Sequence, residues 1–333
     1  MRNIMPSRNK RKNSIQFVMA IILTLATSQG RAQETTSPVE SAETFAQLNI
    51  ARETAGTHWQ AAYDFLCAPA PSVGTPNQSP IVEPTQIFDN LFVIGRSGTV
   101  VYALQTSEGL ILIDAGYRGQ EESVLLPGLA ALGLQPEDIK LVIVAHGHGD
   151  HYGGARYLQE NYGARVALSA ADWAVLDTAR ASEDGALTVP NEDMIVTEGE
   201  SISLGNTEVL PVLIPGHTPG SIGLVFNVRD GDTKHTAALF GGTILIASRI
   251  SSEGLQQYVD SVAHFSEITS NMGATVELQN HPIFDNMPAK LAALKTRQSN
   301  DEHPFVIGES AYQSYLGVIA ECTNVELSRR GDL

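Results

Sequence analysis

The sequence predicts an α/β protein, and within that class a four-layer αββα sandwich. Its 333 residues are 43% hydrophobic, which is sufficient for a sizeable core. Short β-rich runs separated by turn residues begin near residue 91. The same theme then occurs twice, as a group of strands followed by alternating strands and helices. This repetition favours two sheets packed face to face with helices outside.

The amino-terminal 32 residues are typical of a secretory signal peptide. Basic residues cluster at 2–12, an uncharged and mostly apolar run follows at 17–25, and the small residues Gly30 and Ala32 come next. The run is shorter than the ~20 residues of a transmembrane helix. We therefore predict cleavage near Ala32, a periplasmic or secreted protein, and no stable membrane insertion after cleavage. A retained amino-terminal anchor is the alternative.

The predicted mature chain is strongly acidic. Removal of residues 1–32 leaves 15 of the 21 Lys and Arg residues against all 37 acidic ones, a net charge of −22. Binding to nucleic acid requires clustered basic side chains that neutralise phosphates. The charge therefore disfavours nucleic-acid processing as the function.

The two cysteines, Cys67 and Cys322, lie near opposite ends of the mature chain. In an oxidising compartment they could form one disulfide between the amino-terminal segment and the carboxy-terminal helix. Two buried thiols are the alternative.

Residues 33–86 precede the main predicted domain. We expect a flexible tail at 33–43, one or two helices within 44–66, where apolar residues recur at helical spacing, and an extended connector at 67–86, which contains five prolines.

The main domain is predicted at 87–333 and includes the carboxy-terminal helices. Strands are expected at 91–95, 99–106, 109–116, 139–146, 164–170, 201–204, 207–216, 221–228, 235–242 and 275–279. Helices are expected at 121–134, 153–163, 170–180, 255–270, 287–299 and 311–328.

The segment AHGHGDHYGG (145–154) places three histidines and one aspartate within six positions, directly after a predicted strand. His146 and His148 are two residues apart, so in an extended backbone both point to the same side. Asp150 and His151 lie on the turn into the next helix. Imidazole nitrogen and carboxylate oxygen suit Zn²⁺, with another divalent metal as the alternative. Because four ligands of one short loop cannot all face one tetrahedral ion, we predict one site with His146 and His148, and a second with Asp150 and His151.

Two further histidines follow predicted strands and could complete these sites. His217 lies in GHTPG and His281 lies in NHP, and both loops contain prolines that restrict the backbone. The other histidines are expected to be structural or exposed: His58, His235, His264 and His303.

The motifs HGHGDH, GHTPG and NHP, in this order and each at a strand end, resemble those of the metallo-β-lactamase superfamily. GLILIDAG resembles an early strand of that family, and the resemblance extends over about residues 87–294. It implies the αββα sandwich, and two zinc sites with a supporting aspartate behind them. The implied ligands are His146, His148 and His217 at one zinc and Asp150, His151 and His281 at the other, with Asp114 as the support.

The sequence departs from parts of that family in the stretch LFGGTIL. Glyoxalase-like and lactonase-like members have a metal-bridging aspartate there, and the first subclass of metallo-β-lactamases has a cysteine, whereas this chain has Gly241, Gly242 and Thr243. An Asp-His-His second site without that carboxylate resembles the third subclass of class B. Serines that hold the substrate carboxylate in that subclass are missing, which leaves Thr243 as the one hydroxyl. Tyr152 is expected at the pocket wall, and Trp173 in the core.

The resemblance implies a metal-dependent hydrolase with two Zn²⁺ ions, in which a metal-bridging hydroxide opens a cyclic amide. The hydroxide would form at neutral pH because zinc lowers the pKa of water from ~15.7 toward ~7. Asp150 would orient the hydroxide and also bind metal. The expected substrates are β-lactam antibiotics, which implies antibiotic resistance. The alternatives are a lactonase or other ester hydrolase acting on acyl lactones, a glyoxalase-like thioesterase, and an exported metal-binding protein without catalysis. The predicted partner is a small-molecule substrate, and the oligomeric state is left open.

Overall fold

The computed structural model describes residues 40–69, 76–182, 188–298 and 300–333, which belong to one compact unit. The predicted signal peptide (1–32), its cleavage near Ala32 and the residues at 33–39 lie outside the described residues. Within the described residues, no helix combines the length and the apolar character that a membrane span requires.

In the described part of the chain, the first sheet has seven strands, which follow one another in space as they do in the sequence. β1 to β4 pair antiparallel, and β4 to β7 pair parallel, with helices between them. The strands are β1 (Thr85–Phe88), β2 (Leu91–Gly95), β3 (Val100–Thr106), β4 (Gly109–Ile113), β5 (Ile139–Ile143), β6 (Arg165–Ser169) and β7 (Met194–Val196).

The second sheet, again counted over the described residues, has five strands in the spatial order β12-β11-β10-β9-β8. β8 to β11 form an antiparallel meander, and β12 returns parallel to β11 after a long helix. The strands are β8 (Ile202–Leu204), β9 (Thr207–Leu213), β10 (Ile222–Asp230), β11 (Thr233–Phe240) and β12 (Ala274–Leu278).

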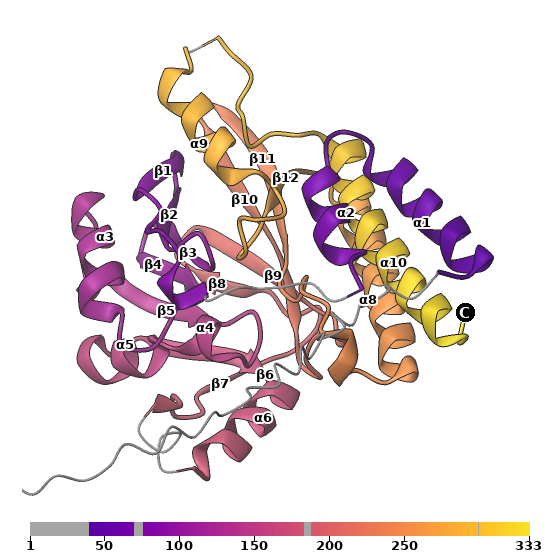
Figure 1. Cartoon of the computed structure of the whole chain (residues 1–333). Helices are drawn as coiled ribbons and strands as arrows, with labels where there is room; N and C mark the ends of the chain where they lie inside the picture. Colours follow the sequence, from indigo (N-terminus) through magenta and orange to yellow (C-terminus); the bar gives the residue numbers. More distant parts are fainter. Residues whose placement is uncertain (1–39, 70–75, 183–187, 299) are drawn as a thin grey trace, which may run out of the picture. The chain divides into compact units, whose positions relative to one another are not determined.

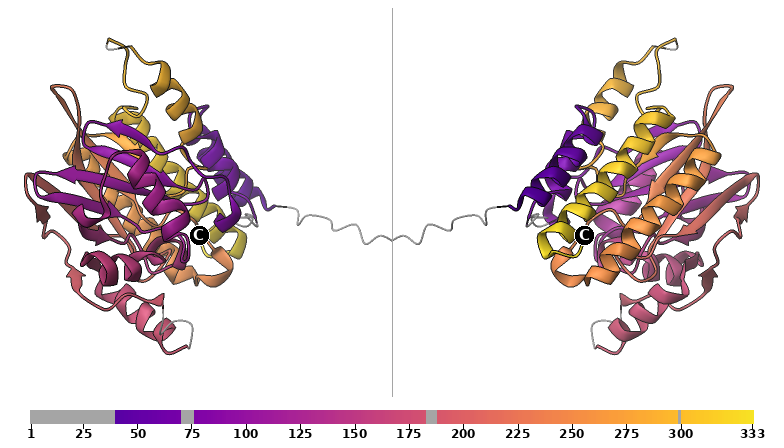
Figure 2. Two further views of the ribbon diagram at one scale, coloured as in Figure 1. Left: turned by 90° about the vertical axis from the view of Figure 1, so that its left-hand side faces the viewer. Right: turned by 90° about the vertical axis from the view of Figure 1, so that its right-hand side faces the viewer.

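Helices cover the outer face of each sheet (Figures 1 and 2). The first sheet carries α3 (Leu126–Ala131), α5 (Ala155–Tyr162) and α6 (Ala170–Arg180), and the second carries α1 (Ala42–Ala55), α2 (Gln60–Leu66), α8 (Ser252–Asn271) and α10 (Glu309–Arg330). α9 (Met287–Thr296) contributes to the core between the sheets. Apolar side chains accordingly form three buried clusters, with one between the sheets and one beneath each helical layer. This arrangement confirms the predicted αββα sandwich.

Two strands escaped the sequence analysis. β1 starts at Thr85, inside the predicted connector and two residues before the predicted domain start at 87. It was not predicted because its short run TQIF directly follows Pro84 in a proline-rich stretch. β7 has three residues, too few for an alternating pattern. The predicted helix at 121–134 begins instead with a π-helical turn, Glu121–Leu125, before α3.

The amino-terminal helices are fastened to the carboxy-terminal helix. Trp59 is buried, donates from Nε1 to the carbonyl of Ala311 at 2.8 Å, and packs on Tyr315. At the end of α2, Cys67 forms a disulfide with Cys322 of α10. The described part of the amino-terminal segment therefore shares a core with the domain that follows it.

Replacing both cysteines by alanine is expected to lower the free energy of unfolding by about 2–5 kcal/mol, because the bond closes a long loop, with a sequence separation of 255 residues. Urea unfolding of the oxidised protein and of the Cys67→Ala/Cys322→Ala variant measures the difference. Reduction should shift the midpoint of the wild type but leave that of the double variant unchanged. Equal midpoints for the oxidised wild type and the variant would contradict the expectation.

Candidate metal centre

The ends of four strands meet at one edge of the sandwich. The loop after β5 of the first sheet and the loops after β9 and β12 of the second bring together all the predicted ligands, and the loop after β4 carries Asp114. A main-chain hydrogen bond from Ile222 N to the carbonyl of Ala145, 2.9 Å long, holds the β5 loop against the second sheet. The site is therefore built from both sheets, on loops that a rigid scaffold supports.

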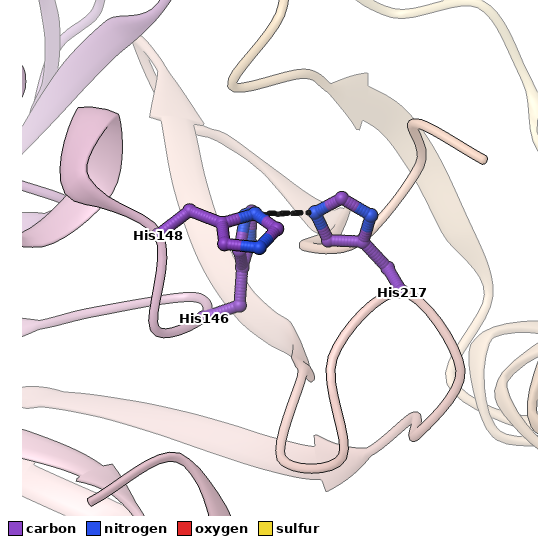
Figure 3. Close-up of side chains that lie close together, drawn as sticks. All are labelled: His146, His148 and His217. Atoms are coloured by element: carbon purple, nitrogen blue, oxygen red, sulfur yellow. Dashed lines mark hydrogen bonds between the residues drawn. The ribbon is translucent and has the colours of Figure 1, made fainter. Parts of the chain in front are cut away.

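The first donor group consists of His146, His148 and His217. His217 Nε2 lies 3.0 Å from His146 Nε2 and 3.0 Å from His148 Nδ1, and Figure 3 shows the three rings pointing toward one another. His146 Nδ1 bonds to the carbonyl of Gly241 at 2.6 Å, so its proton lies on that nitrogen and its Nε2 lone pair faces the group.

The second donor group consists of Asp150, His151 and His281. Asp150 lies in the short helix α4 (Gly149–Tyr152), and its Oδ2 lies 3.5 Å from His151 Nε2. His281 donates from Nδ1 to the carbonyl of Gly98 at 2.7 Å, which leaves its Nε2 free for a ligand role. His151 Nε2 is buried without a hydrogen-bond partner, as expected for an atom that coordinates a cation.

Asp114 supports the second group from behind. Its carboxylate is fully buried, with Oδ2 2.7 Å from His151 Nδ1 and Oδ1 accepting from Ala145 N at 2.8 Å. A further contact comes from Asn280 Nδ2 at 3.3 Å. Asp114 has a left-handed backbone, with φ of 64°, which aspartate tolerates better than most residues. The bond to Nδ1 fixes the tautomer of His151 and orients its Nε2 toward the donor group.

The electrostatic environment differs between the two groups. Burial lowers the pKa of His146 and of His217 well below the usual range, so both rings are neutral and offer lone pairs at pH 7. Burial would also lower the pKa of His151, but the carboxylates of Asp150 and Asp114 raise it to about 10. Burial opposes ionisation of Asp150, yet the neighbouring His151 holds the pKa of that carboxyl well below its usual value. The two carboxylates thus favour a positive charge at His151 Nε2, and a bound metal ion would supply that charge in place of the proton.

Asp172, on α6, joins the two loops of the first group. It is fully buried, and Oδ2 accepts from Gly147 N at 2.6 Å and from Thr218 Oγ1 at 2.8 Å, while Oδ1 accepts from Gly220 N at 3.0 Å. A Cβ at Gly220 would lie 2.5 Å from the backbone nitrogen of Asp172, so this close approach requires glycine. One carboxylate thus fixes the loop of His146 and His148 relative to that of His217.

A chain of hydroxyl groups orients Asp150. Thr99 is buried and donates from Oγ1 to Asp150 Oδ2 at 3.0 Å. The single hydroxyl proton of Thr99 is used in that bond, so Tyr117 OH, at 2.9 Å, must be the donor to Thr99. Burial raises the pKa of Tyr117 to about 12, which keeps its proton in place at neutral pH.

Substitution Thr99→Val is expected to lower kcat about 10-fold to 100-fold, because Asp150 loses the donor that fixes its rotamer while the side-chain volume is nearly unchanged. KM should change much less, since Thr99 does not line the cavity. Steady-state kinetics of Thr99→Val and Thr99→Ser measure the effect, and the serine variant, which retains the hydroxyl, should stay near wild type. Equal losses in both variants would exclude the hydrogen bond as the cause.

Both donor groups lie in a cavity of about 900 Å³, a volume suited to a drug-sized ligand. Two residues expected from the sequence at the substrate pocket do not line it. Thr243 is buried and its hydroxyl is engaged by Phe240 O and Tyr315 OH, at 3.1 and 3.0 Å. Tyr152 packs against the apolar cluster beneath the first helical layer. Trp173 is buried in that same cluster, as expected.

Known proteins resemble this chain in both sequence and structure. Residues 94–236 match the family model described as the metallo-beta-lactamase superfamily. A hydroxyacylglutathione hydrolase of Cereibacter sphaeroides is 32% identical over 262 residues, which are 70% of this chain and 96% of the relative. The chain belongs to the metallo-beta-lactamase superfamily.

Among solved structures, this superfamily member resembles BJP-1, a subclass B3 metallo-beta-lactamase of Bradyrhizobium japonicum, with a TM-score of 0.66 and 26% identity over 77% of this chain and 97% of BJP-1. FEZ-1 from Legionella gormanii shares the fold, with a TM-score of 0.63 and 21% identity over 76% of this chain and 98% of FEZ-1. Members of the superfamily are metal-dependent hydrolases, and this chain is one as well.

Sequence reasoning missed three groups of this centre: Asp172, Thr99 with Tyr117, and Phe65 of the cavity wall. The sequence around Asp172 contains one local signal. Ser169, three residues earlier, caps the start of α6, and its hydroxyl accepts a hydrogen bond from Asp172 N. That signal marks a helix start and does not indicate contact with a metal loop.

Proposed function

We propose that this protein is an exported binuclear zinc hydrolase that opens the cyclic amide of β-lactam antibiotics and thereby confers resistance to them. The observation that carries the proposal is the composition of the two donor groups, which contain one carboxylate, that of Asp150, among the described residues. Gly241 and Gly242 stand where glyoxalase-like members of the superfamily have a bridging aspartate. The likeness to BJP-1 supports the same substrate class.

The donor set fits zinc. Three ring nitrogens converge in the first group, and two ring nitrogens with one carboxylate form the second. We assign His146, His148 and His217 to one ion, and Asp150, His151 and His281 to the other. Zinc bound there would polarise a substrate carbonyl and lower the pKa of water toward neutrality.

The side chains around these groups have separate tasks in the proposed reaction. Asp150, fixed through Thr99, orients the attacking water at the second group in addition to binding metal. Asp114 holds His151, and Asp172 holds the loops of the first group, so that the donors are preorganised before substrate enters. The cavity provides room for a bicyclic substrate and its substituents.

Export to the periplasm or the medium is part of the proposal. A disulfide between Cys67 and Cys322 is typical of an oxidising compartment. The acidic chain, with a formal charge of −16 before any cleavage, suits a small-molecule substrate and disfavours nucleic acid. Mass spectrometry of the protein from the extracytoplasmic fraction should give a mature chain that begins near Gln33. Full-length protein confined to the cytoplasm would contradict export.

A second candidate is hydrolysis of an ester or thioester. Several relatives of this chain are hydroxyacylglutathione hydrolases. None of the described residues that line the cavity is Lys or Arg, side chains that pair strongly with a carboxylate such as that of a β-lactam.

One preparation of the zinc-loaded protein distinguishes the candidates. Turnover of a penicillin, a cephalosporin and a carbapenem should be compared with that of an acyl lactone and a hydroxyacylglutathione thioester, each before and after removal of metal by a chelator. We expect the β-lactams to give the highest kcat/KM, lost on chelation and restored by zinc. A preference for the lactone or the thioester would replace the first proposal with the second.

A further inference from the structure

The cavity has an apolar wall beside its metal floor. Four large apolar side chains line it, from three distant parts of the sequence: Phe65, Ile244, Ile246 and Ile283. Ile283 follows the donor His281 by two residues and is 50% exposed. A large apolar side chain exposed next to a donor group leaves apolar surface in contact with water, and a ligand would gain free energy by covering it.

The wall carries no charge of its own. Among the described residues that line the cavity, none is Lys or Arg, and the single acidic residue is the donor Asp150. Apart from the metal donors and the four apolar side chains, the lining residues carry no charge, with Asn77, Gln78 and Ser79 among them. A substituent that covers the wall is therefore apolar and uncharged, since a charged group would lose hydration without gaining a partner.

The amino-terminal side of the cavity, which includes Phe65 of the wall, is held in place before any ligand binds. Phe65 packs edge-on against Phe284, with ring centroids 5.2 Å apart, and lies two residues before the disulfide at Cys67. The carbonyl of Ser79 accepts from Arg96 at 2.6 Å, and the carbonyl of Asn77 accepts from Gln120 Nε2 at 2.9 Å. A preformed surface binds without the entropic cost of ordering loops.

We propose that the wall formed by Phe65, Ile244, Ile246 and Ile283 is a specificity site for a bulky, uncharged aryl or alkyl substituent of the substrate. The site selects substrates in which that substituent lies beside the scissile carbonyl. The inference rests on the proposed hydrolase function for the identity of the scissile bond, whereas recognition of the apolar substituent depends on the wall alone.

Binding of a thiol series tests the wall without requiring hydrolysis. Thiolates bind zinc, so benzyl mercaptan, 2-phenylethanethiol and 3-phenylpropanethiol share one anchor and differ in the length of the apolar tail. Isothermal titration calorimetry of the zinc-loaded protein should show affinity that rises up to about fourfold for each added methylene group. Ile283→Ala and Phe65→Ala should flatten this rise while zinc content stays at the wild-type value.

Matched variants separate a local effect from a general one. Ile195→Ala removes the same atoms from an isoleucine that is 55% exposed on β7, outside the cavity, and should keep the full dependence on tail length. Phe65→Leu keeps an apolar side chain at α2 and should retain most of it. A flat series in the wild type, absence of thiol binding, or a series unchanged in both Ile283→Ala and Phe65→Ala would overturn the inference.

The two proposals can fail independently. A protein that shows the tail-length dependence but hydrolyses no β-lactam leaves the apolar site in place and removes the proposed substrate. A protein that hydrolyses β-lactams equally well with small and with bulky aryl substituents, and shows a flat thiol series, retains the proposed function and lacks the specificity site.

Discussion

Replacement of His217 by alanine is expected to reduce bound zinc and to lower kcat/KM by more than about 100-fold. His217 Nε2 is the nitrogen that both other members of the first donor group approach, each at 3.0 Å. Changes to the residues that support a ligand already cost about 10-fold to 100-fold in metal affinity or activity, so loss of the ligand itself should cost more. Metal analysis and hydrolysis assays on the same preparation measure both effects.

His264→Ala is the matched control for this experiment. His264 is exposed, pairs with Glu198 on the surface, and lies outside both donor groups. It should retain the zinc content and the turnover of the wild type. Near-native zinc content and activity in His217→Ala would show that the donor assignment is wrong.

The substitution Asp114→Asn is expected to weaken metal binding at the second group about 10-fold to 100-fold. Asparagine has nearly the same shape and also tolerates the left-handed backbone at this position. It lacks the negative charge that faces His151 Nδ1 at 2.7 Å, so the ring is oriented less firmly. Competition with a chromophoric chelator measures the affinity of the two sites separately.

Asp114→Asn should leave the first group nearly unaffected, because Asp114 contacts none of its three histidines in the described hydrogen bonds. Asp230→Asn provides the control. Asp230 lies outside both donor groups and pairs with Arg297 near the surface. Equal weakening at both metal sites would point to a general loss of structure instead of a local effect on His151.

The donors of the metal centre could be predicted because each of them follows an apolar strand directly in the sequence. β5 precedes His146, β9 precedes His217 and β12 precedes His281, so the strand pattern alone located these histidines at sheet ends. The alternation of strands and helices predicted the layers for the same reason. Local patterns were therefore sufficient to predict the functional residues that lie in loops directly after a strand.

The remaining features depend on contacts between segments that are far apart in the sequence. Thr99 meets Asp150 across 51 residues, and Phe65 reaches the cavity of a domain that was predicted to begin at residue 87. Thr243 was expected at the substrate because of its place in the chain, yet its hydroxyl turns inward to Tyr315. Side-chain direction in such loops is decided by packing partners that no local pattern identifies.

Each donor group combines side chains from both sheets of the sandwich. His146 and His148 follow a strand of the first sheet and His217 one of the second, and the same division holds for Asp150 with His151 and for His281. A cation bound by either group is therefore a crosslink between the two halves of the fold. By mass action, stability against unfolding should rise with free metal concentration as RT ln(1 + [M]/Kd), so that metal supply controls how long the protein survives as well as how fast it works.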